Sequence, residues 1–142
     1  MGKTVEFKRP DGQAVKGYLA EAPDALGAVV VIQEWWGVND QIRGVAERFA
    51  GAGFTALVPD LYRGKSTVEA AEAHHLMTGL HFGDAAAQDV RGAVQYLKAA
   101  RIGRGKVGVT GFCMGGALTV LSASMVPDAD AGVVWYGYPP LE

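Results

Sequence analysis

Apolar residues recur along this chain in short, nearly continuous runs, and four of these runs predict strands, of which 28–32 is typical of a strand buried on both faces of a parallel sheet. The runs cover residues 28–32, 54–58, 106–110 and 132–136. Two earlier segments, 5–9 and 15–20, alternate apolar with polar residues on either side of the turn sequence Pro-Asp-Gly, which predicts an antiparallel hairpin. We therefore expect a hairpin followed by buried parallel strands.

The segments between these runs show the periodicity of helices. Apolar residues spaced along one helix face predict a helix over 39–50, capped by Asn39 or Asp40. Further helices are predicted over 67–80 and 84–100, and another is predicted to begin by residue 117. Strands that alternate with helices indicate an α/β fold, with a mostly parallel sheet flanked by helices.

We expect residues 1–142 to form a single domain, because the chain contains no repeat and no low-complexity linker. The last predicted strand ends near Tyr136, and no helix follows that could cover it. We therefore expect the domain to be incomplete, truncated after this strand.

Composition and charge exclude several classes of function. With 49% hydrophobic and 20% charged residues and a formal net charge of −2, the chain suits a globular protein without a basic surface for nucleic acid or an anionic membrane. The longest apolar run, 28–32, is too short to cross a bilayer. The single cysteine cannot form an internal disulfide, so we expect a reducing compartment and a cytoplasmic location.

The sequence Gly-Phe-Cys-Met-Gly-Gly at 111–116 stands between a predicted strand and a predicted helix. It fits the nucleophile-elbow pattern G-x-S-x-G with cysteine in the serine position, where flanking glycines allow a sharp turn. A helix that begins at Met114 would offer free backbone N–H groups and a partial positive charge to a thiolate at Cys113. The alternative is that Cys113 is a small buried residue that packs behind the sheet.

Two further motifs accompany the elbow, in order along the chain: Gln-Glu-Trp-Trp-Gly at 33–37 and Pro-Asp-Leu-Tyr at 59–62. Together, and from about residue 4 to the end of the chain, they resemble the dienelactone hydrolase family. This family is also called carboxymethylenebutenolidase and has the α/β-hydrolase fold. The resemblance implies hydrolysis of dienelactones or of other small carboxylic esters and lactones.

The resemblance also implies roles for particular residues. It makes Cys113 the catalytic nucleophile and Glu34 the glutamate that contacts the resting thiol and helps to activate it. The backbone N–H groups of Met114 and Trp35 would form the oxyanion hole. The family's aspartate and histidine would lie beyond residue 142, and no histidine follows Cys113. The chain thus corresponds to the N-terminal part of a complete member, and we expect little hydrolytic turnover from it alone.

Several residues near these motifs allow two interpretations. Glu34 follows an apolar strand and precedes two tryptophans, where it could exchange a proton with a thiol, or it is a solvated glutamate at a strand end. Trp35 and Trp36 line a pocket for a flat lactone ring, or they fill the core or a subunit interface. Tyr136 contacts substrate, or it packs at the edge of the sheet.

The three histidines do not indicate a metal site. His74 and His75 are adjacent, so on a helix they point in different directions and cannot bind one ion together, and His81 follows the predicted helix end. We expect surface or interface roles for all three, and neither a metal nor a cofactor. The segment 67–80 also lacks the arginine that the best-known members of the resembled family use for the substrate carboxylate, which leaves the substrate open among small esters and lactones.

Two alternatives to catalysis by this chain remain. An open sheet edge after Trp135 favours association with a second copy, as a homo-oligomer, or with a complementing C-terminal chain. A redox-responsive binding module that uses the thiol of Cys113 is the other alternative.

Overall fold

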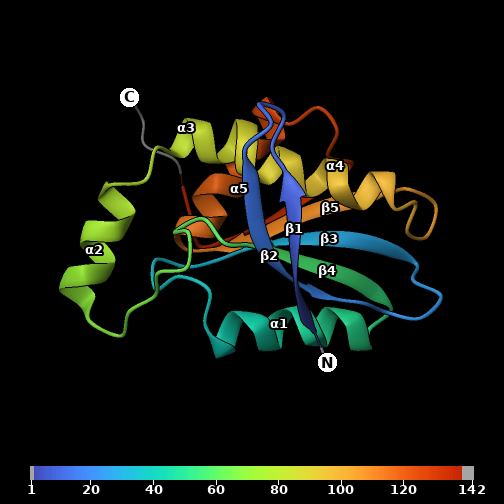
Figure 1. Ribbon diagram of the computed structural model, residues 1–142, viewed down its shortest axis with the longest axis horizontal. Helices are drawn as coiled ribbons and strands as arrows, with labels where there is room; N and C mark the ends of the chain where they lie inside the picture. The colour runs from blue at the N-terminus through green and yellow to red at the C-terminus, as the bar shows by residue number, and fades with distance from the viewer. Residues whose placement is uncertain (1, 139–142) are drawn as a thin grey trace.

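The computed structural model describes residues 2–138, which form one six-stranded sheet with helices on both faces (Figure 1). The strand order is β1-β2-β4-β3-β5-β6. Strand β2 is antiparallel to both β1 and β4, whereas β3 is parallel to β4 and β5, and β5 is parallel to β6. The predicted mostly parallel α/β sheet is therefore confirmed. The strands are β1 Lys3–Lys8, β2 Ala14–Ala20, β3 Gly27–Ile32, β4 Phe54–Pro59, β5 Val107–Phe112 and β6 Ala131–Trp135.

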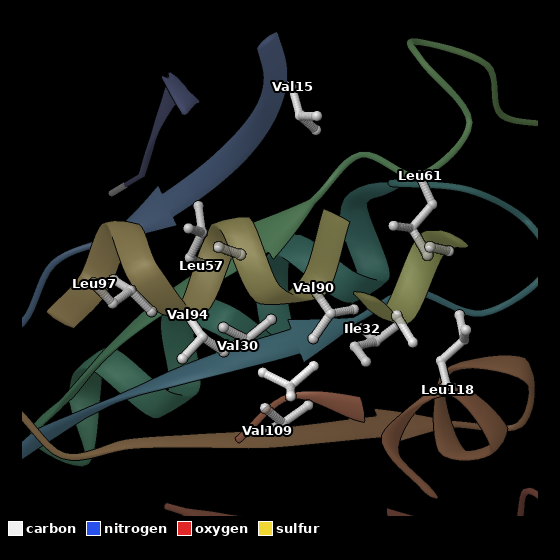
Figure 2. Packing of buried hydrophobic residues seen from close by; sticks show 14 of the residues in the cluster. Val15, Val30, Ile32, Leu57, Leu61, Val90, Val94, Leu97, Val109 and Leu118 are labelled. Carbon is white, nitrogen blue, oxygen red and sulfur yellow. The ribbon is translucent and has the colours of Figure 1, made fainter. Parts of the chain in front are cut away.

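The helices divide the core into two parts. Helix α1 (Asp40–Gly51) covers one face of the sheet, and α4 (Arg91–Ala99) and α5 (Met114–Met125) cover the other (Figure 1). In β3, Val30 belongs to the larger cluster on the α4 and α5 side, and Val31 belongs to the smaller cluster on the α1 side. Both valines are fully buried, which explains why this strand is a continuous apolar run. Figure 2 shows the larger cluster, in which side chains from β3, β5 and α4 meet.

Helix α1 begins where the sequence predicts. The Asn39 side-chain oxygen accepts a hydrogen bond from the N–H of Ile42 at 3.1 Å, which satisfies one of the free donors of the first turn. Ile42 and Ala46 are buried on the predicted apolar face. Helix α2 (Ala70–Thr78) is shorter than the predicted helix over 67–80 and stands away from the sheet (Figure 1).

The predicted single helix over 84–100 is wrong in its first half. The segment consists of a short α3 (Phe82–Asp84), a π-helix η1 (Ala85–Val90) and then α4. Within η1, the buried carboxylate of Asp89 accepts hydrogen bonds from Arg9 at 2.9 Å and from Arg63 at 2.6 and 3.1 Å. Because the partners of Asp89 lie far away in the sequence, helical periodicity alone could not predict this π-helix.

Part of the sheet face next to α1 is uncovered. There, β3, β5 and β6 line an apolar hollow of about 420 Å³ whose walls include Val29, Phe49, Phe54, Val133 and Trp135. Strand β6 forms one edge of the sheet, and each of its residues is exposed. Among residues 2–138, no helix is long and apolar enough to cross a bilayer.

Candidate active site

Cys113 occupies a sharp turn between β5 and α5. Its backbone has φ 57 and ψ −113, in the region of positive φ that residues with a side chain rarely adopt. A Cβ atom at Gly111 would overlap the carbonyl group of Gly115, and one at Gly115 would lie 2.5 Å from the carbonyl oxygen of Ile32. Both positions therefore require glycine, as the elbow pattern predicts.

The side chain of Cys113 is exposed at the start of the twelve-residue helix α5. The alternative of a small cysteine buried behind the sheet is therefore wrong. The amino end of a helix favours negative charge, so this position suits a sulfur that reacts as an anion. A molecule in solvent can reach the thiol directly.

The segment after β3 lies beside the elbow. In the parallel pairing of β3 with β5, Ile32 is opposite Gly111, so the residues that follow both strands meet at the same edge of the sheet. Close packing of Gly115 on the carbonyl groups of Ile32 and Gln33 confirms this contact. Glu34, which follows Gln33, is half-buried at this edge.

Tyr136 joins these residues from the end of β6. Reduced contact of its hydroxyl with water, followed by the nearby negative charges of Glu34 and Cys113, raises the pKa of Tyr136. Cys113, Glu34 and Tyr136 thus follow three neighbouring parallel strands, β5, β3 and β6, at the same edge of the sheet. Tyr136 is 72% exposed, and its ring lies 6.3 Å from that of Phe112.

The two tryptophans after Glu34 differ in their surroundings. The half-buried side chain of Trp35 packs against the larger hydrophobic cluster, which fits the core-filling interpretation. Trp36 is also half-buried and meets Trp35 edge to face, with ring centroids 5.3 Å apart. The backbone of this segment is held by a turn in which the N–H of Gly37 donates to the carbonyl of Glu34 at 3.2 Å.

Sequence reasoning missed one residue at this site, Tyr62. Its hydroxyl lies 3.3 Å from the sulfur of Met114, the residue after Cys113, and burial raises the pKa of Tyr62 to about 12. The available signal was the Pro-Asp-Leu-Tyr motif at 59–62, which indicated the fold but not this contact. Within that motif, Asp60 stabilises the following loop, because its carboxylate accepts a hydrogen bond from the N–H of Gly64 at 2.6 Å.

The histidines lie apart from this arrangement. His74 and His75 are exposed on α2, and His81 caps α3 by accepting a hydrogen bond from the N–H of Asp84 at 3.0 Å. Within residues 2–138, no three side chains of histidine, cysteine, aspartate or glutamate are grouped closely enough to hold a metal ion.

An exposed nucleophile elbow after a parallel strand, beside the loop that follows a neighbouring strand, defines a chain with the α/β-hydrolase architecture. The sequence profile of the dienelactone hydrolase family matches residues 15–142. The chain belongs to this family, which is a family of hydrolases.

Named relatives agree with this membership. The chain is 40% identical over 146 residues to Protein usf of Aquifex pyrophilus, which covers 98% of this chain and 63% of the relative. It is 31% identical over 145 residues to Carboxymethylenebutenolidase 1 of Cupriavidus pinatubonensis, which covers 94% of this chain and 60% of the relative. The chain thus spans less than two thirds of the length of these relatives.

Solved structures show the same fold. A dienelactone hydrolase-like promiscuous phosphotriesterase from metagenomic libraries, P91, superposes with a TM-score of 0.77 at 26% identity, over 96% of this chain and 59% of that protein. An esterase from Pyrococcus furiosus superposes with a TM-score of 0.72 at 20% identity, over 96% of this chain and 52% of that protein, which supports the fold alone.

Proposed function

We propose that this chain carries the nucleophile of a hydrolase of small carboxylic esters or lactones, and that Cys113 is this nucleophile. The observation that carries the proposal is the exposed Cys113, with its positive φ of 57°, at the start of α5, where the elbow packs on the backbone just before Glu34. A serine or cysteine in such a turn attacks carbonyl carbon in other α/β-hydrolases. The family membership supports the same chemistry.

The proposed first step is acylation of Cys113. Glu34 accepts the thiol proton, the sulfur forms a bond to the carbonyl carbon, and the carbonyl electron pair moves to oxygen. Backbone N–H groups of Met114 and Trp35 stabilise this oxyanion. When the carbonyl reforms, the bond to the alkoxide oxygen breaks, the alkoxide takes the proton back from Glu34, and a thioester remains on Cys113.

The proposed second step is hydrolysis of that thioester by water. The resemblance assigns activation of this water to an aspartate and a histidine that would follow residue 142. Acylation needs only the residues described above, so it can be measured separately from turnover. The chemistry requires no metal and no cofactor in this scheme.

Aromatic side chains around Cys113 form the proposed contact surface for the acyl group. Tyr136 is the stronger candidate, because it directly follows Trp135, whose carbonyl accepts a hydrogen bond from the N–H of Cys113 at 3.0 Å. Trp36 is the second candidate, since it is partly exposed at the same edge of the sheet. A reducing, cytoplasmic environment would keep the single cysteine in its thiol form, which the proposed reaction needs.

A single-turnover assay tests the proposal. The 142-residue chain is mixed with p-nitrophenyl acetate, release of p-nitrophenolate is followed, and the intact mass is then measured. We expect one acetyl group per chain, located on Cys113 by peptide mapping, and no acetylation of the Cys113→Ala variant. Ser124→Ala, which removes an exposed hydroxyl from α5, is the matched control and should react like the unchanged chain. Equal bursts from the unchanged chain and Cys113→Ala would refute the proposal.

A second candidate function is association through β6. Its support is the exposure of Val133 (53%), Val134 (42%) and Trp135 (47%) on an edge strand that adjoins the apolar hollow. An edge of this kind pairs readily with another strand, either from a second copy or from a complementing chain. Light scattering tests the first case: we expect a dimer that Val133→Lys dissociates, and a monomer at high protein concentration would exclude it.

A further inference from the structure

Gln33 is a fully buried polar side chain at the end of β3 whose role the proposed chemistry does not yet explain. Its exposed fraction is 0%. A buried carboxamide must satisfy both of its ends, since an unpaired polar group inside a protein is destabilising. Its oxygen accepts a hydrogen bond from the N–H of Leu61 at 3.1 Å, and its nitrogen donates to the carbonyl oxygen of Glu34 at 3.3 Å.

These two hydrogen bonds fix the orientation of the carboxamide. Only the oxygen can accept from the N–H of Leu61, and only the nitrogen can donate to the carbonyl of Glu34. The side chain therefore joins two loops, one after β3 and one after β4, in a single geometry.

The carbonyl of Glu34 belongs to the same planar peptide group as the N–H of Trp35. In a trans peptide these two groups point in opposite directions, so a partner that holds the carbonyl also sets the direction of the N–H. Gln33 holds this carbonyl from one side, and the N–H of Gly37 holds it as well at 3.2 Å. The elbow packs against the same backbone, because a Cβ at Gly115 would lie 2.6 Å from the carbonyl oxygen of Gln33.

The geometry points to Gln33 as a positioning residue: its buried carboxamide fixes the peptide between Glu34 and Trp35 and so aims the Trp35 N–H at the oxyanion that forms on acylation of Cys113. This inference rests on the proposed function, in which that N–H is an oxyanion donor. Gln33 itself does not touch the reacting atoms. Preorganised donors stabilise an oxyanion because they need no reorientation when the charge develops, and a small displacement removes much of that effect.

Two reactions of the same thiol separate this role from general stability. Acetylation by p-nitrophenyl acetate creates an oxyanion, whereas alkylation by iodoacetamide displaces iodide from a saturated carbon and creates none. The ratio of the two rate constants therefore reports on the oxyanion hole and not on the reactivity or accessibility of the thiol. Gln33→Met and Gln33→Leu have a similar size but lack both hydrogen bonds. Ser122→Ala is the matched control, since it removes a buried hydroxyl that bonds to Leu118 within α5.

We expect the ratio of acetylation to alkylation to fall by roughly 10- to 100-fold in both Gln33 variants, and to stay unchanged in Ser122→Ala. Circular dichroism confirms that each variant is folded, and Gln33→Leu keeps the test available if Gln33→Met does not fold. Unchanged ratios in folded Gln33 variants would overturn the inference while leaving the proposed function intact. Failure of the unchanged chain to be acetylated on Cys113 would instead refute the proposed function, and the inference with it.

Discussion

The backbone N–H of Cys113 donates a hydrogen bond to the carbonyl of Trp135 at 3.0 Å, so the elbow is anchored to the end of β6. Tyr136, the first residue after β6, also has a positive φ, of 39. Gly137 then packs so closely on the elbow that a Cβ there would overlap the carbonyl of Cys113. The unusual conformation at Cys113 is thus held by contacts with the end of β6 and with the turn that follows it.

This strained backbone leads to a prediction about the stability of variants at Cys113. This backbone conformation destabilises the folded state by about 1–3 kcal/mol for a residue with a side chain. Glycine avoids this strain but loses more conformational entropy on folding. We expect Cys113→Gly to be more stable than Cys113→Ala by about 1 kcal/mol in urea unfolding, after these two effects are combined. Equal stabilities would show that the turn is unstrained.

The close packing of Gly111 makes a second prediction. A methyl group there would meet the backbone of Gly115, which no rotamer change can relieve, so Gly111→Ala should destabilise the fold by more than about 3 kcal/mol. The matched control is Gly44→Ala in α1, where a methyl group meets nothing within 4 Å and should stabilise the helix by about 0.5–1 kcal/mol. Thermal unfolding of both variants checks the opposite signs, and a stable Gly111→Ala would contradict the elbow geometry.

The ion pairs of Asp89 make a third prediction. Its side chain is 2% exposed and pairs with Arg9 and Arg63, so Asp89→Asn removes the carboxylate partner of Arg63 and one of the three carboxylates around Arg9, which keeps Asp11 and Asp84. Removal of one member of a buried ion pair destabilises by about 3–5 kcal/mol. Asp40→Asn is the control. Asp40 pairs with Arg43 and is itself fully exposed to solvent, and ion pairs at the surface contribute less than about 1 kcal/mol. Similar losses in both variants would mean that the buried pairs are not special.

The hydroxyl of Tyr62 makes a prediction about alkaline pH. Burial raises the pKa of Tyr62 from 10.0 to about 12, so the unfolded chain ionises this group before the folded chain does. The associated stability is therefore complete below pH 10 and is lost as the pH rises from 10 to about 12.

We expect Tyr62→Phe to show a smaller loss of stability across that pH window than the unchanged chain, measured by urea unfolding at several pH values. Tyr138→Phe, at a position that is 82% exposed, is the control and should follow the unchanged chain. A Tyr62→Phe variant with the same pH dependence as the unchanged chain would show that Tyr62 is not shielded from water.

The strands and the elbow could be predicted because their signals are local. The fully buried run in β3 and the glycines around Cys113 are each visible within a few neighbouring residues. The π-helix could not be predicted, since its buried Asp89 is matched by Arg9, 80 residues earlier in the chain. Tyr62 was missed for the same reason, because Met114 lies 52 residues away.

The end of strand β5, just before Cys113, could not be predicted either, because it depends on a neighbouring strand. The sequence predicted a strand end at Thr110, but β5 continues to Phe112, whose ring stacks on Trp135 with an interplanar angle of 16°. Pairing with β6 extends the strand, and no residue near Thr110 reports the presence of that neighbour. The roles of Cys113 and Glu34 stay predictions that the acylation experiment tests.

The loops at the carboxyl edge of the parallel strands contain different side chains from those that form the core. Trp36 and Tyr136 project from loops at this edge, whereas the fully buried side chains that hold the sheet, such as Val30 and Leu118, lie within elements beneath it. Under the proposed function, a library that varies Trp36 and Tyr136 together would change substrate preference without altering the buried side chains that hold the sheet. Residues in the loops at this edge can therefore change during evolution while the buried side chains that determine the fold stay the same.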